Sequence, residues 1–543
     1  MDEANLFRLN ELCDFVFAFI GHISSSLKQN SSYEQVRVFG IPAQLWFHSY
    51  PSIRLHQVTY PVKSLFFLLA EVDIDKAELS GNLFSVKRIE ELIHENGIRF
   101  LGVKYTDLVG RLRHVTVPIR RLKTVMQEGI GFDASSVLGF KAVDAGDMCL
   151  FPDFGTAFIE PFAKLPTVSC FADIRDPVTD KAYERDPREV LRRAMNVAKK
   201  ELQCDAMMFL SEFEFYLFDK AEYFSDKGSV YYKLESRELT KDNRSGYILV
   251  DSGYHTAPPF DRSMDLRSEV CRICDECGVS MKYHHHESGR FSHVEIESEF
   301  HSGLAAADGV MLGKYIIKNV ALRDGRTATF MPKPIYGEPG SGMHFHQYAS
   351  SKGISLFGDL RNPTRLSKLA HFYIGGILNH APSLCAFTNP STSSFRRLIP
   401  GYEAPTMAFF SIGNRTAAVR IPGYIRDVKK MEVEYRIPDG TCNPYLAIAA
   451  VVLAGVDGIV RKLDPGMPFQ GKLKDAEKKF GSHALPRSLP EALAALRKDN
   501  DYLRRDDVFS EGILDFWQRY KQAEAESIML RPHPWEYNLY YGC

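Results

Sequence analysis

The chain has 543 residues, of which 45% are hydrophobic and 25% are charged, and its formal net charge is −1. This composition is typical of a globular protein with two or three domains, and the near-neutral charge gives no argument for a nucleic-acid or membrane-surface partner. The ten cysteines follow no disulfide spacing, which favours reduced thiols. The longest apolar runs, near Phe15–Ile20 and Leu65–Ala70, are too short to span a membrane, and neither has the features of a secretory signal. We therefore expect a cytoplasmic protein.

Residues 1–82 are the least informative part of the chain. Leu6, Leu9, Cys13 and Phe17 recur at helical spacing, but no sustained hydrophobic period follows them. We expect an N-terminal extension of unknown role. Two interpretations stay open: a poorly ordered extension or over-long start, and a docking or regulatory segment.

A small α+β domain is expected over residues 83–180. SVKRIEELIHENG (85–97) has the pattern of an amphipathic helix that ends at a glycine. IRFLGVKYTDLVGRLRHVTVP (98–118) is typical of a hairpin with its turn near Asp107–Gly110. The loop FDASSVLGF (132–140) then carries Asp133, Ser135 and Ser136, although such a motif alone is more often an ordinary turn.

After a helix expected within Pro187–Leu202, four apolar segments each carry two polar residues that are two positions apart. Because side chains alternate along a strand, both members of each pair project from one face. Several strands with paired polar groups indicate the wall of a metal and anion site, while a solvated rim is the alternative for any one of them. The pairs are Glu212 with Glu214, Glu295 with Glu297, His344 with His346, and Glu434 with Arg436.

The third pair follows a glycine-rich turn, MPKPIYGEPGSGMHFHQY (331–348), whose glycines let the backbone approach a ligand closely. His285 and Glu287 share a face in the same manner, in MKYHHHESGR. Several glutamates with one or two histidines suit a hard cation such as Mg²⁺ or Mn²⁺ better than zinc.

The C-x-x-C-x-x-C spacing of Cys271, Cys274 and Cys277 can indicate a zinc or iron–sulfur site. The segment Ser263–Cys277 has a helical pattern, however, and three-residue spacing then places the thiols along one face. We expect these cysteines to face the core.

Arginines are unusually dense among apolar residues in 394–422, where Arg396, Arg397, Arg415 and Arg420 occur with Glu403. Guanidinium groups match phosphates and carboxylates, whereas exposed surface arginines are the alternative. The chain has no Walker-type or GxGxxG motif. The residues alone thus predict metal-assisted phosphoryl or acyl chemistry on anionic substrates.

Several long motifs together resemble the glutamine synthetase family, type I: FEFYLF, HHHE, MPKP..G.PGSGMHFH, RRLIPGYEAP, NRTAAVRIP, VEYRIPDGTCNPYLA and HPWEYNLYY. They occur in the order of that family, over about Phe84 to Cys543. The resemblance implies an α+β fold with a small β-grasp-like N-terminal domain (83–180). A catalytic domain (181–543) with a curved antiparallel sheet and flanking helices would follow it. It also implies a homo-oligomer, a dodecamer of two hexameric rings whose active sites are shared between subunits.

The implied reaction joins ammonia to the γ-carboxylate of glutamate. ATP would phosphorylate that carboxylate, and ammonia would attack the γ-glutamyl phosphate. The resemblance assigns two Mg²⁺ or Mn²⁺ ions, one to Glu214, Glu287 and Glu295 and one to Glu212, His344 and Glu434.

The resemblance also assigns the substrates to named residues. Arg415, Arg420 and Arg436 would neutralise the phosphoryl charge, while Arg397 and Gly340 would hold the glutamate. His285, His346 and Phe300 would lie near the nucleotide. Asp133, Ser136, Tyr254, Glu287 and Glu403 would bind and deprotonate ammonium, and Glu403 would close the site.

Four positions depart from the residues common in the family: Ala134 for glycine, Pro339 for asparagine, His293 for glutamine and Tyr348 for serine. Residues 459–500 contain no tyrosine, so we expect no adenylylation there. Two other functions remain open, ligation of glutamate to a polyamine or other amine, and a non-catalytic structural or regulatory role.

Overall fold

The computed structural model describes residues 37–38, 41–42, 89, 91–239, 252–471 and 473–543. The chain divides into two units, Met1–Ser80 and Gly81–Cys543. In the first unit, β1 (Arg37–Val38) pairs antiparallel with β2 (Ile41–Pro42). The expectations for the rest of residues 1–82 lie outside the described residues. Of the helix expected at 85–97, residues 89 and 91–96 are described and helical, and Gly97 follows them at φ 58°, as predicted.

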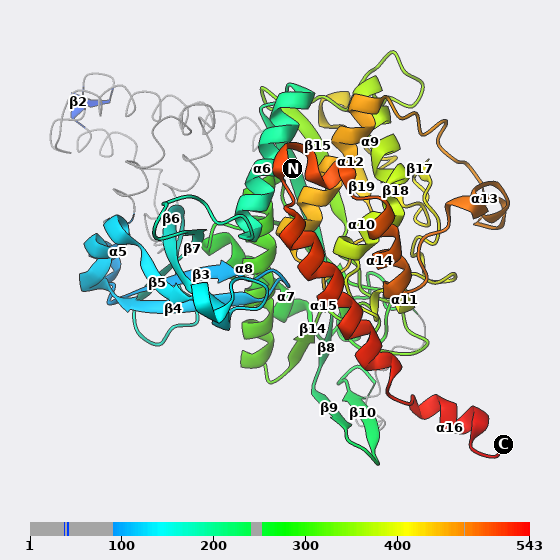
Figure 1. The fold of residues 1–543 in the computed structure, drawn as a ribbon, viewed down its shortest axis with the longest axis horizontal. Coiled ribbons are helices and arrows are strands. Elements are labelled where there is room, and N and C mark those ends of the chain that lie inside the picture. Colours follow the sequence, from blue (N-terminus) through cyan, green and yellow to red (C-terminus); the bar gives the residue numbers. More distant parts are fainter. Residues whose placement is uncertain (1–36, 39–40, 43–88, 90, 240–251, 472) are drawn as a thin grey trace. The chain divides into compact units, whose positions relative to one another are not determined.

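The small domain of the second unit is built on a five-stranded sheet of order β4-β3-β7-β6-β5. β3 and β7 are parallel, and the other neighbours are antiparallel (Figure 1). The hairpin predicted from the sequence is β3–β4, and its turn contains Gly110 at φ 86°. The elements are β3 (Phe100–Thr106), β4 (Leu112–Pro118), η3 (Ile119–Arg121), α5 (Leu122–Glu128), β5 (Ile130–Asp133), η4 (Ala134–Ser136), η5 (Val143–Ala145), β6 (Asp147–Ile159) and β7 (Thr167–Arg175).

A second sheet, of ten strands, forms the centre of the larger domain. Its main path is β11-β12-β8-β15-β19-β18-β17, and it is antiparallel except for the parallel pair β17 and β18. The expected antiparallel sheet is therefore mixed at this edge. The strands are β8 (Ala206–Phe218), β11 (Met281–His286), β12 (His293–Ser298), β13 (His301–Ser302), β14 (Thr327–Thr329), β15 (Phe345–Ser351), β16 (Ile354–Ser355), β17 (Phe410–Ile412), β18 (Val419–Ile421) and β19 (Val433–Tyr435).

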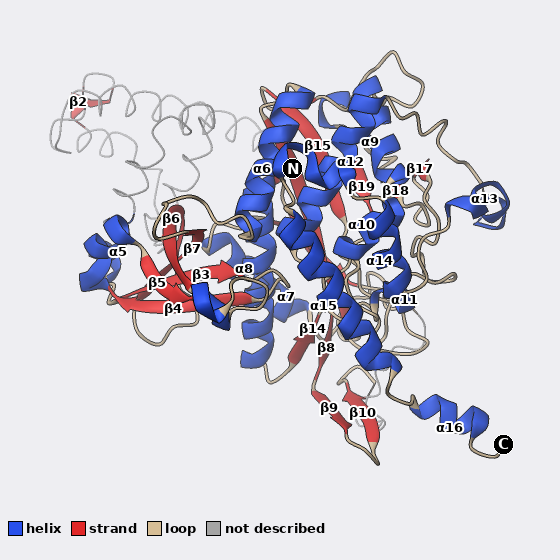
Figure 2. Cartoon of the chain, viewed as in Figure 1, coloured by secondary structure: helices blue, strands red, loops and turns tan. Residues whose placement is uncertain are grey.

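Helices flank this sheet, and a separate hairpin, β9 (Lys220–Ser225) with β10 (Val230–Glu235), follows β8 (Figure 2). The helices predicted from 187–202 and 263–277 are present as α6 and α7. The helices are α6 (Pro187–Leu202), α7 (Met264–Glu276), α8 (Gly303–Arg323), α9 (Lys368–Asn379), α10 (Ala381–Thr388), α11 (Ser394–Arg397), η7 (Val428–Lys430), α12 (Pro444–Arg461), α13 (Leu473–Phe480), η8 (Gly481–His483), α14 (Leu489–Lys498), η9 (Asp501–Asp507), α15 (Glu511–Met529) and α16 (Pro534–Tyr540).

Helix α12 lies in the core. It starts at Asn443, whose Oδ1 accepts the Tyr445 N–H, and Pro444 at its first position has the φ that a helix start requires. Helix α12 is long and apolar enough to cross a membrane, but 83% of this 18-residue segment is buried inside the protein. A Cβ on Gly376 of α9 would lie 2.0 Å from the Ala454 carbonyl oxygen. The close packing of α9 on α12 therefore requires glycine at this position.

Buried charges tie the small sheet to the helices. The Arg188 guanidinium of α6 donates to Asp308 of α8 at 2.7 and 2.9 Å and to Asp173 of β7 at 2.5 Å. Tyr445 of α12 donates to the same Asp308 carboxylate at 2.6 Å. Because breaking such a buried pair leaves an uncompensated charge, this network fixes how β7 meets α6 and α8.

Helix α7 carries Cys271 and Cys274, and the third cysteine noted in the sequence, Cys277, directly follows its last residue. Cys274 and Cys277 are buried and Cys271 is half-buried, and all three are free thiols. The prediction of core-facing cysteines on a helix is confirmed.

Candidate active site

Strand register brings the paired polar residues of the sequence to one place. Across β8 and β12, Glu214 lies directly opposite Glu295, and Glu212 lies opposite Glu297. Glu434 of β19 lies opposite both His346 of β15 and Arg420 of β18. Because side chains alternate along each strand, the polar groups collect on the same face of the sheet.

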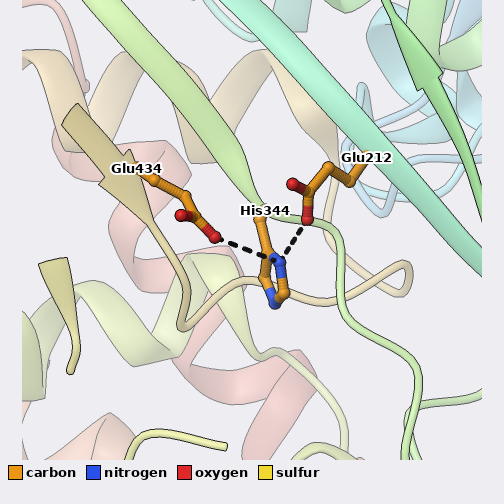
Figure 3. A group of neighbouring side chains, drawn as sticks. All are labelled: Glu212, His344 and Glu434. Atoms are coloured by element: carbon orange, nitrogen blue, oxygen red, sulfur yellow. Dashed lines mark hydrogen bonds and ion pairs between the residues drawn. The ribbon is translucent and has the colours of Figure 1, made fainter. Parts of the chain in front are cut away.

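Glu212, His344 and Glu434 form the first group with the geometry of a metal site. They come from three separate segments and point toward one another (Figure 3). His344 Nδ1 is in contact with Glu212 Oε2 and lies 3.7 Å from Glu434 Oε1. One ligand atom from each residue falls within 4.8 Å of the others, which agrees with the set implied by the resemblance.

The other implied set is distributed over two overlapping groups that share Glu295. One contains Glu212, Glu214 and Glu295, and the other contains His285, Glu287 and Glu295. His285, which was expected near the nucleotide, lies among these carboxylates, with its Nε2 3.6 Å from Glu295 Oε1.

The carboxylates of the site divide into two groups by the direction in which their pKa values are shifted. Burial raises the pKa of Glu212, but the nearby His344 and His346 outweigh it, so the pKa lies well below its usual value. Burial and the neighbouring Glu212, Glu287 and Glu214 raise the pKa of Glu295 well above its usual value. Burial and Glu214 also raise the pKa of Glu287. The Glu287–Glu295 side therefore lacks positive charge and fits a cation.

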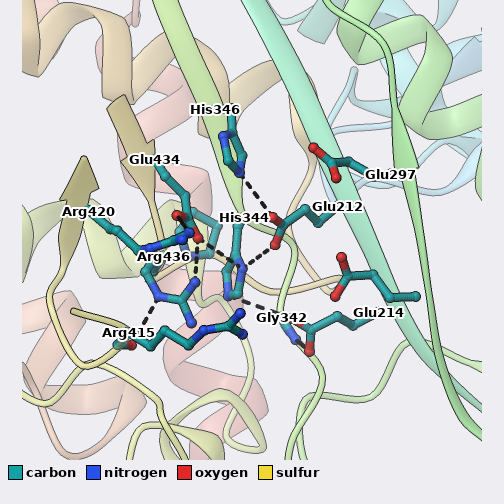
Figure 4. Close-up of polar contacts among 12 residues, drawn as sticks. Glu212, Glu214, Glu297, Gly342, His344, His346, Arg415, Arg420, Glu434 and Arg436 are labelled. Carbon is teal, nitrogen blue, oxygen red and sulfur yellow. Dashed lines mark hydrogen bonds and ion pairs between the residues drawn. The ribbon is translucent and has the colours of Figure 1, made fainter. Parts of the chain in front are cut away.

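Arginines surround the opposite side of the site (Figure 4). The guanidinium groups of Arg420 and Arg436 both contact the fully buried carboxylate of Glu434. Arg436 Nε also donates to the Arg415 carbonyl at 3.0 Å, which links the two segments. The site thus combines a carboxylate-lined end with a cationic end.

Arg397 is buried at 5% exposure, yet among the described residues it forms no ion pair within 4 Å. Its guanidinium donates to the Ile437 carbonyl at 2.8 Å and the Arg436 carbonyl at 3.1 Å, and lies 2.9 Å from His344 Nε2. A buried guanidinium without a carboxylate partner suits an anionic ligand.

A cavity of about 560 Å³ joins these groups. Lining residues from the predicted set are Glu212, Glu214, Tyr254, His285, Glu287, Glu295, Gly340, His344, Arg397, Glu403, Arg415, Arg420 and Arg436. Most of the polar residues singled out from scattered parts of the sequence therefore face one space.

Tyr254, Arg415 and Glu403 lie together at the exposed part of this cavity. Arg415 Nη1 lies 3.8 Å from Glu403 Oε2, and its guanidinium lies over the Tyr254 ring at 5.6 Å. Glu403 has a φ of 55°, which is unusual for a residue that is not glycine. Such strain concentrates at ligand clamps and mobile closures.

Five predicted residues do not line the cavity. One of them, Glu434, is fully buried in contact with the Arg420 and Arg436 guanidinium groups. Asp133 and Ser136 are exposed on the small domain, where Asp133 accepts hydrogen bonds from Ser135 and Ser136. His346 is buried behind the carboxylates, 2.9 Å from Glu212 and 2.6 Å from Glu432. Phe300 contacts the edge of Tyr348, with ring centroids 4.9 Å apart.

Other residues of the site were missed in the sequence. Lys282 lines the cavity and donates to buried Glu297 at 2.7 Å. Strand alternation could not place Lys282, because the register of β11 shifts between Met281 and Tyr283. Glu432, which holds His346, could have been noticed only as a carboxylate two residues before Glu434.

Comparison with known proteins agrees with this geometry. Residues 97–177 match the model of the glutamine synthetase beta-grasp domain, and residues 184–540 match that of the glutamine synthetase catalytic domain. Glutamine synthetase of Frankia alni is 41% identical over 461 residues (83% of this chain, 97% of the relative). That of Streptomyces filamentosus is 40% identical over 462 residues (83% and 98%). The glutamine synthetase structure from Plasmodium falciparum superposes with a TM-score of 0.76 at 26% identity (84% and 98%). The chain belongs to the glutamine synthetase family.

Proposed function

We propose that this protein is an ATP-dependent glutamate–ammonia ligase. It joins ammonia to the γ-carboxylate of L-glutamate and releases glutamine, ADP and phosphate. The observation that carries the proposal is one cavity that is lined by carboxylates, by His344 and by Arg397, a buried arginine that forms no ion pair with the described residues. A carboxylate has no useful leaving group, so an amine can displace its oxygen only after phosphorylation.

Two divalent cations, Mg²⁺ or Mn²⁺, fit this donor set. The pKa values of Glu287 and Glu295 are raised because their ionised forms are buried beside other carboxylates, and a hard cation would stabilise those ionised forms. Glu212, His344 and Glu434 would hold one ion, and Glu214, Glu287 and Glu295 would hold the other. When bound, the ions would neutralise the negative charge of the ATP phosphates.

The amino-acid substrate would lie beside Arg397 and Gly340, which both line the cavity. The guanidinium would pair with the α-carboxylate, since it has no carboxylate partner of its own within 4 Å among the described residues. The γ-carboxylate then lies toward the cationic end formed by Arg415, Arg420 and Arg436. These arginines stabilise the transferring phosphoryl group by charge, which requires no movement during the reaction.

The nucleotide would enter beside His285, with Phe300 available for stacking on the base. His346 acts from behind the site: by bridging Glu212 and Glu432 it orients Glu212 rather than touching the nucleotide. Metal ligands are oriented by such outer hydrogen bonds.

Ammonium binding falls to Tyr254, Glu287 and Glu403. Glu403 would remove a proton from ammonium and, by closing over the cavity, keep water from the γ-glutamyl phosphate. Asp133 and Ser136 lie on the small domain outside this cavity, so we assign them to the site of a neighbouring copy. With this assignment we propose a homo-oligomer with shared sites, a dodecamer by resemblance to the family, and a cytoplasmic location.

The proposal is tested by phosphate release in the presence of ATP, glutamate and Mg²⁺, with ammonium compared with ethylamine and putrescine. We expect release to depend on ammonium and to match glutamine formation. Preference for either amine would replace this function with an amine ligase, and no release with any acceptor would favour a non-catalytic homologue.

A further inference from the structure

His293 of β12 lies at the centre of an arrangement that the proposed roles leave unexplained. It is 1% exposed and lies directly opposite Tyr216 of β8 in the strand register. The two rings are parallel within 5°, with centroids 4.2 Å apart. This stack fixes the imidazole plane.

The hydrogen bonds of His293 define its tautomer. The Gly289 backbone N–H donates to Nδ1 at 3.3 Å, so Nδ1 accepts and the proton resides on Nε2. Nε2 lies 3.2 Å from Ser341 Oγ and 3.9 Å from Glu214 Oε2. A Cβ on residue 289 would lie 2.4 Å from the Tyr216 hydroxyl, so glycine is needed for this approach.

The acceptor, Ser341, belongs to the glycine-rich turn that faces the substrate cavity. The same turn is held at Pro339, whose carbonyl accepts from the Tyr216 hydroxyl at 2.6 Å. The Gly342 N–H donates to Glu214 Oε2 at 2.7 Å. Between these contacts lies Gly340, where a Cβ would be 2.7 Å from Arg397 Cγ.

We propose that His293 is a positioning residue. Together with Tyr216, it holds the turn Pro339–Gly342 in a fixed position beside Glu214 and Arg397. Its ring lines the cavity, but we assign it no contact with the substrate or the cations, because it acts through Ser341. The turn then presents Gly340 to the amino-acid substrate and the Gly342 N–H to a proposed metal ligand. The inference rests on the proposed function for the identity of that substrate.

A neutral donor is suited to this position. An arginine or lysine in place of His293 would form an ion pair with Glu214 and compete with the cation for its charge. The Nε2–H of a neutral imidazole fixes the turn while the negative charge of Glu214 stays available.

The test compares His293→Gln with His293→Asn. Glutamine carries an amide N–H near the position of Nε2, whereas the asparagine amide reaches only the position of Nδ1. We expect His293→Gln to behave like the wild type. In His293→Asn we expect the glutamate KM and the Mn²⁺ dissociation constant each to rise on the order of 10-fold, with a smaller change in kcat. Mn²⁺ binding is measured by electron paramagnetic resonance without substrates.

Two further variants separate positioning from a general loss of packing. Ser341→Ala should reproduce the effect of His293→Asn, and the double variant should be no worse than either single variant. His301→Asn is the matched control on β13, outside the cavity-lining residues, and should change neither constant. Equal constants in wild type and His293→Asn, or equal losses in His293→Asn and His301→Asn, would overturn the proposal. If the wild type made no glutamine while His293→Asn still weakened Mn²⁺ binding, the proposed function would fail and the positioning role would stand.

Discussion

Glu214 and Glu295 face each other across two hydrogen-bonded antiparallel strands, β8 and β12, and both are buried. Like charges that lie directly opposite in a sheet are destabilising. The protein keeps this unfavourable pair at a cavity wall, which is where a cation relieves the repulsion. A substitution that removes one of these two carboxylates should therefore alter both the stability of the metal-free protein and its binding of cations.

Glu295→Gln tests this coupling. Replacing one of the facing carboxylates by an uncharged amide should raise the melting temperature of the metal-free protein, abolish the further increase caused by Mn²⁺ and lower kcat at least about 100-fold. Differential scanning calorimetry with and without Mn²⁺ measures the first two effects. Glu299→Gln, at an exposed position four residues further on, is the control and should leave all three unchanged. A Mn²⁺-dependent stabilisation that survived in Glu295→Gln would contradict the assigned ligand.

Cation binding should depend on pH because two of the carboxylates titrate above the ordinary range. Burial and neighbouring glutamates raise the pKa values of Glu287 and Glu295, so protons occupy these groups at pH values where a free glutamate is ionised. Cations compete with those protons. Mn²⁺ affinity should therefore fall as pH is lowered, with proton release on binding that calorimetry in buffers of different ionisation enthalpy detects. An affinity independent of pH between 5 and about 8 would be inconsistent with these shifts.

Much of this site was predictable from the sequence because its polar residues lie two positions apart on strands, where both members of a pair share one face. Glu212 with Glu214 and Glu295 with Glu297 lie on apolar segments whose period assigns both members to one face. The alternation of side chains along one strand does not tell which strands pair or in which register. The direct opposition of Glu214 and Glu295 could therefore not be predicted. The parallel pairing of β17 with β18 was missed for the same reason.

The contributions of two further residues required tertiary contacts. His346 has the same spacing as a metal ligand, but packing places it behind Glu212, where both of its ring nitrogens meet carboxylates. Phe300 was assigned to adenine by resemblance alone, and its contact with Tyr348 depends on β15, which is distant in sequence.

Arg397→Lys should specifically weaken glutamate binding. Lysine keeps the charge but loses the planar fork that pairs with a carboxylate. We expect the glutamate KM to rise on the order of 100-fold, which is about 3 kcal/mol, while the ATP KM changes little. Arg396→Lys, at the exposed neighbouring position, is the matched control. Equal effects of the two substitutions on the glutamate KM would exclude the α-carboxylate role.

Glu403→Ala should separate phosphorylation from amide formation. Without the carboxylate, ammonium is not deprotonated and water reaches the intermediate, so glutamine formation should fall by about 100-fold or more. Nucleotide binding should persist, and phosphate release should exceed glutamine formation. Parallel assays of both products measure this ratio. Full synthetase turnover in this variant would show that Glu403 has no such role.

His380 lies outside the active site, and its contacts predict that the stability of the protein depends on pH. Its ring nitrogens lie 2.8 Å from Asp499 and 2.9 Å from Asp457, joining α10 to α12 and the segment after α14. Burial lowers the pKa of His380, but the two aspartates outweigh it and the net pKa is raised. A histidine with a raised folded-state pKa stabilises fully below the unfolded value of about 6.5, and this contribution is lost as pH rises through the folded value.

His380→Phe should therefore be less stable than the wild type by about 1–3 kcal/mol at pH 6, and the difference should shrink toward pH 9. His371→Phe, on the neighbouring helix α9, is the control, because its pKa is lowered by burial. Thermal unfolding at both pH values gives the comparison. A difference between wild type and His380→Phe that stayed constant over this range would show that His380 acts by packing alone.

The transfer of phosphate to the glutamate carboxylate can be followed with oxygen isotopes. Glutamate labelled with ¹⁸O in its γ-carboxylate is incubated with ATP, Mg²⁺ and ammonium, and the released phosphate is analysed by mass spectrometry. If the γ-carboxylate attacks ATP and ammonia then displaces phosphate, one labelled oxygen per glutamine formed appears in the phosphate. Phosphate free of label, in the presence of glutamine formation, would contradict this mechanism.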